Sequence, residues 1–161
     1  MSKLLLTIAF SVAALVAFAP GSAEAGWVIE GSLGKGAEIS PDQRAEPTNV
    51  MFAPGYQLLG IVRLQLGLVG ELADVENRDF DLQLRPMIGI YPPILPIYGR
   101  LILAVEGLRD DPTIAVGGAG GIKFGIPFTG LGIFAEVGVL PRLVDNTQLI
   151  VEGRVGAYWA F

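Results

Sequence analysis

The chain contains no cysteine and no histidine, and these two absences exclude much of the chemistry found in protein sites. Without cysteine it has neither a disulfide framework nor a thiolate metal site. Without histidine it lacks the usual general base and the commonest transition-metal ligand. Beyond residue 25, serine occurs only at Ser32 and Ser40, so an acyl-transfer site cannot be assembled in the usual way. We therefore expect a protein that is not an enzyme and that uses no cofactor or metal.

Positive charge is scarce as well. The 161 residues include 11 basic and 16 acidic side chains, which gives a net charge of −5. No basic patch is visible along the chain, so nucleic acid is not an expected partner.

Long apolar runs are missing after residue 25, although 52% of all residues are hydrophobic. No stretch of the remaining chain is long enough to cross a membrane as a helix. Such a composition fits either a large soluble core or a membrane barrel. Residues 26–161 suffice for a single domain.

The first 25 residues have the pattern of a secretory signal peptide. Lys3 gives a basic start, residues 4–19 are apolar, and Ala-Glu-Ala at 23–25 supplies a small-residue cleavage site. We predict cleavage after Ala25, which leaves a domain over residues 26–161. An uncleaved anchor is the weaker interpretation, because the apolar run is short for a membrane span.

The rest of the chain predicts short strands. Glycine and proline recur every few residues, which disfavours helices. Segments with period-two alternation occupy residues 27–34, 50–55, 60–72, 80–90, 97–107, 113–124, 131–140 and 147–161. Polar connections over 38–49, 73–79, 108–112 and 141–146 alternate with apolar or Pro/Gly turns over 56–59, 91–96 and 125–130. The pattern predicts an all-β fold, an eight-stranded antiparallel up-and-down transmembrane barrel with both termini on the periplasmic side.

The last segment illustrates the two faces that such a barrel needs. One alternate set runs through apolar residues to Trp159 and Phe161, whereas the other carries Glu152 and Arg154. Side chains alternate sides along a strand, so one face meets lipid and the other a polar interior.

The same alternation places charged residues of every strand on one common face. The opposite faces carry no charge apart from strand ends, as lipid contact requires. We predict that the charges pair inside the barrel and fill its narrow interior. The predicted lumenal network consists of Glu30, Arg63, Glu71, Asp81, Arg85, Arg100, Glu106, Lys123, Glu136, Glu152 and Arg154.

Most aromatic residues fall at the predicted periplasmic end. This distribution is typical of the interfacial girdle of a membrane barrel. The predicted girdle comprises Trp27, Tyr56, Tyr91, Tyr98, Phe124, Phe128, Tyr158, Trp159 and Phe161.

Two local features have structural interpretations. The glycine-rich stretch 117–121 fits no phosphate-binding spacing, so we expect it to let the barrel curve or to make room for lumenal arginines. Pro86 lies on the lipid-facing set of its strand and cannot donate a ladder hydrogen bond, so we expect a bulge or bend there.

Together, the signal segment, the amphipathic strands, the charged interior and the aromatic last strand resemble the small bacterial outer-membrane barrels of the OmpA/OmpX type. The resemblance covers residues 26–161 and is architectural. It implies that the closing strand, through Val155, Ala157, Trp159 and Phe161, is a signal for the barrel-assembly machinery. Simple lipid contact by these residues is equally compatible with the pattern.

These observations favour a non-enzymatic outer-membrane barrel with a structural or surface-interaction role. We expect lipid and lipopolysaccharide to surround its outer wall, and we expect the barrel to be a monomer. A narrow channel for water or small solutes is one alternative. A soluble periplasmic, lipocalin-like binder of apolar ligands is another, but it would expose a continuous apolar surface to water.

Overall fold

The structure is a computed structural model that describes residues 26–40, 44–72, 82–92, 95–108, 112–143 and 148–161. The predicted signal segment and Asp81 therefore lie outside the described residues. No helix within the described ranges is long and apolar enough to span a membrane.

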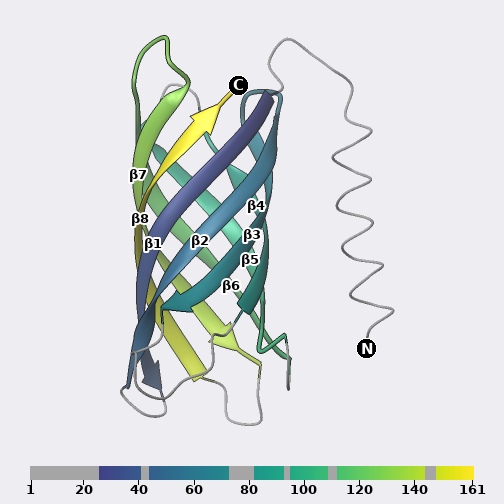
Figure 1. The fold of residues 1–161 in the computed structure, drawn as a ribbon, viewed down its shortest axis with the longest axis vertical. Helices are drawn as coiled ribbons and strands as arrows, with labels where there is room; N and C mark the ends of the chain where they lie inside the picture. The colour runs from purple at the N-terminus through teal and green to yellow at the C-terminus, as the bar shows by residue number, and fades with distance from the viewer. Residues whose placement is uncertain (1–25, 41–43, 73–81, 93–94, 109–111, 144–147) are drawn as a thin grey trace, which may run out of the picture.

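Eight antiparallel strands close into a barrel in chain order, with β8 paired to β1 (Figure 1). This confirms the predicted fold class. The strands are β1 Gly26–Ser40, β2 Arg44–Leu58, β3 Val62–Leu72, β4 Leu82–Ile90, β5 Ile97–Glu106, β6 Thr113–Gly125, β7 Leu131–Arg142 and β8 Gln148–Ala160.

The two ends of the barrel differ. At one end, the backbones of Trp27 and Phe161 exchange hydrogen bonds of 2.8 and 2.9 Å, which places the start of β1 beside the end of β8. The connections after β2, β4 and β6 return at this end, which we call the terminal end. Strands β1, β3, β5 and β7 finish at the opposite end, which we call the loop end.

The first two strands are longer than predicted. Pairing of β1 with β2 continues to Glu38 and Arg44, with a register shift between Lys35 and Ala37. The polar connection expected over 38–49 is therefore mostly strand, and this prediction was wrong. Its polar residues do not mark a loop, because the inward face of a strand in this barrel can carry polar side chains such as Glu38 and Asn49.

The bulge expected at Pro86 is absent. Pro86 pairs with Leu66 of β3 without a register shift, whereas Arg85 and Pro86 are not paired with β5. Pro54 and Pro141 behave in the same way, each paired on one side with a gap on the other. The N–H of one strand residue points toward a single neighbour, so proline costs one ladder its bond and leaves the other intact.

The gap beside Pro141 is accompanied by a close backbone approach at Gly117 on β6. A Cβ at this position would lie 1.9 Å from the carbonyl oxygen of Val139 on β7. Glycine is therefore required at residue 117, which fits the structural interpretation of the glycine-rich stretch.

Candidate functional site in the barrel interior

The predicted lumenal charges point into the barrel. Asp81 lies outside the described residues, and Glu71 and Lys123 are partly buried. The remaining residues of the set are all buried, with 2–6% of their surface exposed: Glu30, Arg63, Arg85, Arg100, Glu106, Glu136, Glu152 and Arg154.

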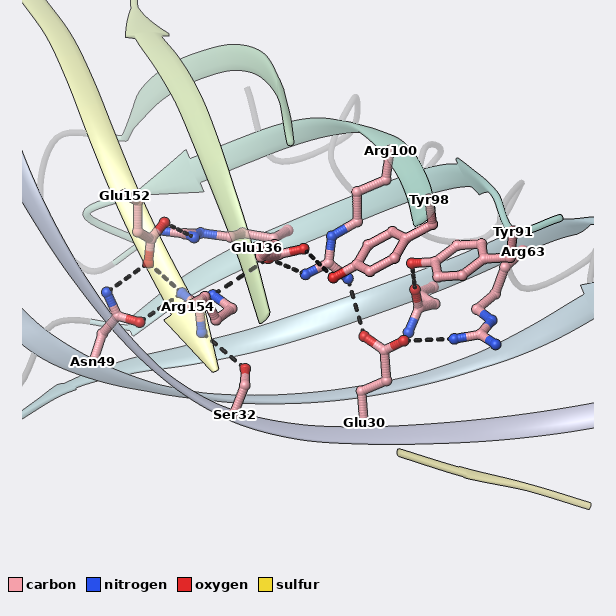
Figure 2. A network of polar contacts seen from close by, with 12 residues as sticks. Glu30, Ser32, Asn49, Arg63, Tyr91, Tyr98, Arg100, Glu136, Glu152 and Arg154 are labelled. Carbon is pink, nitrogen blue, oxygen red and sulfur yellow. Dashed lines mark hydrogen bonds and ion pairs between the residues drawn. The ribbon is translucent and has the colours of Figure 1, made fainter. Parts of the chain in front are cut away.

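The first half of the network connects strands that are not neighbours in the sheet (Figure 2). Glu30 of β1 accepts from Arg63 of β3 at 2.6 Å and from Arg100 of β5 at 3.0 Å, one on each carboxylate oxygen. Arg100 also pairs with Glu136 of β7. These contacts cross the lumen and link all four odd-numbered strands, β1, β3, β5 and β7.

The second half continues from Glu136 through Arg154 of β8. The Arg154 guanidinium lies 3.8 Å from Glu136 and also pairs with Glu152 on its own strand. Glu152 then accepts from Arg85 of β4 at 2.6 Å. Arginines and glutamates thus alternate from Arg63 to Arg85, and each carboxylate in this path contacts two guanidinium groups.

Uncharged polar side chains complete the network, and the sequence interpretation did not include them. Asn49 donates to Glu152 at 2.9 Å and accepts from Arg154 at 2.6 Å. Ser32 also accepts from Arg154, at 3.0 Å. All of them lie on the inward alternate set of their strands, so alternation alone could have identified them. Gln57 and Gln83 accept similarly from Arg63 and Arg85, respectively.

Three residues assigned to the aromatic girdle lie inside the barrel instead. Tyr91 and Tyr98 are buried and stack with ring centroids 4.7 Å apart, while the partly buried Tyr158 packs against the same cluster. The prediction for these three tyrosines was wrong. A residue near the end of a strand can face either the lipid or the interior, and these three face the interior. Their hydroxyls suit the polar interior: Tyr98 donates to Glu136 at 2.8 Å.

The other predicted girdle residues lie on the outside near the terminal end. Trp27, Phe124, Phe128, Trp159 and Phe161 are exposed, and the half-exposed Tyr56 meets Trp27 edge to face at 5.3 Å.

A second, smaller ionic cluster lies toward the loop end. Arg142 of β7 donates to Glu106 of β5 at 2.5 Å and lies 3.3 Å from Glu46 of β2. Arg142 and Glu46 were missed because the sequence interpretation assigned both to polar connections. Glu38, in the same predicted connection, is also buried.

An apolar cluster also fills part of the interior, which alternation had assigned entirely to charge. Every strand from β2 to β8 contributes to it. Its buried members are Met51, Ala53, Val69, Met87, Ile102, Ala104, Ala115, Leu140 and Ile150. The interior therefore holds apolar side chains as well as the ionic network.

Lys123 stands apart from the ionic network. Its ammonium lies 5.5 Å from the Tyr91 ring, and within the described ranges it makes no ion pair. The described residues also contain no group of three or more acidic side chains that could hold a metal ion.

The residues of the predicted assembly signal lie on the outward set of β8. Val155, Ala157, Trp159 and the following Phe161 are exposed beside β1. Their placement suits lipid contact, and their role in assembly stays a prediction.

No protein-family model matches the chain, and no curated protein matches its sequence. Solved structures do match. The crystal structure of Neisserial surface protein A is 11% identical with a TM-score of 0.57, covering 88% of this chain and 99% of that protein. The solution NMR structure of the de novo designed TMB2.3 is 9% identical with a TM-score of 0.53, covering 86% and 97%. At such low identity the likeness establishes the barrel fold.

Proposed function

We propose that this chain is an integral outer-membrane barrel with a closed interior and a structural or surface-interaction role in the envelope. The observation that carries the proposal is that charged side chains lie inside the barrel and apolar side chains lie outside. Charged groups are paired inside, whereas the outer wall exposes large apolar residues such as Leu101, Ile133 and Val137. A soluble protein avoids a continuous exposed surface of this kind.

The same division argues against a lipocalin-like binder in the periplasm. Such a protein needs an apolar interior that can hold a ligand and a polar exterior. Here the interior holds Arg63, Arg85, Arg100 and Arg154 in ion pairs, and the exterior is apolar.

The interior also favours a closed barrel over a channel. An eight-stranded barrel is just wide enough for side chains to fill it. In this chain, the pairs Glu30–Arg100 and Arg85–Glu152 cross the lumen, and Met51, Leu140 and Ile150 pack in the apolar cluster. An absence of catalytic histidine and cysteine supports a non-enzymatic role.

Membrane insertion and closure are tested separately. The full chain, expressed with its first 25 residues, should fractionate with the outer membrane and migrate differently on SDS gels with and without boiling. Recovery from the soluble periplasm with no heat-dependent shift would overturn the membrane proposal. In planar bilayers the folded protein should give no steady conductance. A large, steady single-channel current would favour the channel alternative instead.

Within this proposal, lipid and lipopolysaccharide surround the outer wall, and the barrel-assembly machinery receives the closing strand. The exposed side chains of Val155, Trp159 and Phe161 support a role in that recognition. Both termini are then periplasmic, and the loop end faces the outside.

A further inference from the structure

One charged side chain lies on the outside of the barrel wall. Because β1 continues past residue 34, Lys35 falls on its outward set, and Lys35 is exposed. Among the strand residues whose side chains the structure describes, no other charged residue lies on the outward set. Within those residues Lys35 also has no ion-pair partner. This corrects the expectation that outward faces carry charge only at strand ends.

The position of Lys35 makes the missing partner significant. Two more outward residues, Ala37 and Ile39, lie between it and the end of β1, and Ile39 is an exposed apolar residue. Its cross-strand neighbours are Thr48 of β2 and Gly153 of β8, so Lys35 lies on the outer wall before β1 ends. An unpaired cation on the lipid face of a barrel is destabilising, and the cost rises from the interface toward the midplane. An anion from the lipid would remove this cost.

An apolar groove lies on the same outer wall, and its lining ends one outward residue before Lys35 on β1. It has a volume of about 870 Å³ and crosses the outer wall from β2 over β1 and β8 to β7 and β6. Small residues, Gly31, Ala135 and Ala157, lie between larger ones such as Phe52 and Phe124. This volume falls within the usual range of ligand sites.

The strand register places the cation at one end of this groove. Leu33 lines the groove and pairs with Val50 on one side and Val155 on the other, both of which also line it. Lys35 follows one outward step later, roughly 7 Å along the strand toward the loop end. A cation and an apolar groove are thus arranged in line along the wall.

We propose that this surface binds one anionic phospholipid, with its phosphate on Lys35 and an acyl chain in the groove. The inference rests on the proposed membrane location. The charge selects the occupant: an apolar groove alone would suit any hydrocarbon or a second copy of the barrel, whereas the single ammonium at its end complements one anionic headgroup. The reach of the lysine stem lets its head meet the phosphate while its methylenes stay on the apolar wall.

The structure offers substitutions that fill the groove without disturbing the fold. A Cβ added at Gly31 would meet no atom within 4 Å. Gly31→Phe therefore places a ring over the groove floor. Gly99→Phe is a matched control on the outward set of β5, where the nearest atom to an added Cβ is the Ala119 carbonyl oxygen at 3.9 Å and Gly99 lies outside the groove.

The experiment is native mass spectrometry of the full folded barrel in detergent, with dioleoyl phosphatidylglycerol or dioleoyl phosphatidylcholine added. We expect a single retained phosphatidylglycerol. Lys35→Ala should lower this retention about fivefold, the effect of one lysine near an anionic lipid surface. Lys35→Arg should keep it, Gly31→Phe should abolish it, and Gly99→Phe should leave it unchanged.

Several outcomes would overturn the inference: equal retention by wild type and Lys35→Ala, equal retention of the two lipids, or a dimer that covers the groove in place of lipid. Competition by inorganic phosphate alone would mean that the acyl chain is not bound. Each variant is first checked for its heat-dependent gel shift. A barrel that inserts and shifts normally but shows no lipid preference refutes this inference alone, whereas failure to insert refutes the proposed function.

Discussion

The ionic network predicts a large loss of stability when Glu30 is replaced by glutamine. Glu30→Gln keeps the shape of the side chain but removes the charge that Arg63 and Arg100 share, at 2.6 and 3.0 Å. Glu30 is 2% exposed, so water cannot take over the role of the carboxylate.

The magnitude follows from what remains around each arginine. Arg63 keeps the Gln57 amide oxygen and the face of the Tyr91 ring, 3.9 Å from its guanidinium, but no other carboxylate of the described residues pairs with it. Arg100 keeps Glu136. Removing one partner of a buried ion pair costs about 3–5 kcal/mol, because it leaves a buried charge uncompensated. We expect Glu30→Gln to fall in this range, with Arg63 as the main origin of the loss.

Unfolding in urea, with the barrel in lipid vesicles, measures this loss. The two tryptophans of the chain, Trp27 and Trp159, both lie on the outside near the seam between β1 and β8, so their emission reports closure of the barrel. Glu46→Gln is the matched control. Its carboxylate lies 3.3 Å from Arg142 with 17% exposure, and Arg142 retains Glu106. The control should lose less than about 1 kcal/mol, as pairs reached by water do.

A double variant separates the coupling between Glu30 and Arg63 from the effects of changing each residue alone. Glu30→Gln combined with Arg63→Gln should lose less than the sum of the single losses, because Arg63 is then no longer a buried cation without its anion. If Glu30→Gln lost no more stability than Glu46→Gln, the reasoning that the lumenal pairs brace the barrel would be refuted.

Two further predictions concern the backbone and the closing strand. Gly117→Ala should prevent refolding into vesicles, measured by the heat-dependent gel shift, because its Cβ would meet the Val139 carbonyl oxygen. Gly153→Ala is the control and should fold normally, since a Cβ there has no atom within 4 Å. Equal folded yields of the two variants would contradict this prediction. Phe161→Ala keeps the backbone bonds to Trp27, so refolding in vitro should be unchanged while the amount in the outer membrane of cells falls. Unchanged amounts in cells would leave Phe161 with lipid contact alone.

Alternation was sufficient to predict the fold and the inward direction of the described residues of the charged network, although not the outward Lys35. The reason is physical: the period of a strand is two, and a charge in the hydrocarbon is costly, so Glu136, Glu152 and Arg154 can face only inward. The same rule would have found Asn49 and Ser32 had uncharged polar residues been included.

Alternation does not show how the inward side chains pack together. Met87 and Leu140 lie on the same alternate set as Arg85 and Glu136, so alternation places them inward, but their cluster is formed with residues of other strands. The tyrosines show the same limit. Tyr98 suits an interface by type, but its hydroxyl has a nearby acceptor, Glu136, contributed by a strand 38 residues away. Contacts across the lumen depend on the closure of the barrel, which the sequence of one strand does not contain.

The lumenal pairs have a role that the backbone ladder cannot perform. Ladder hydrogen bonds join only neighbouring strands, whereas Glu30 joins β1 to β3 and β5, and Glu152 joins β8 to β4 across the barrel. These contacts resist flattening of the cross-section because they act along its diameter. A conducting lumen would need water in the space that these ion pairs occupy. Removing the ion pairs to make room for water would also remove the contacts that stabilise the cross-section. Stability and conduction therefore oppose each other in this interior, so variants that open the lumen should also be the least stable ones.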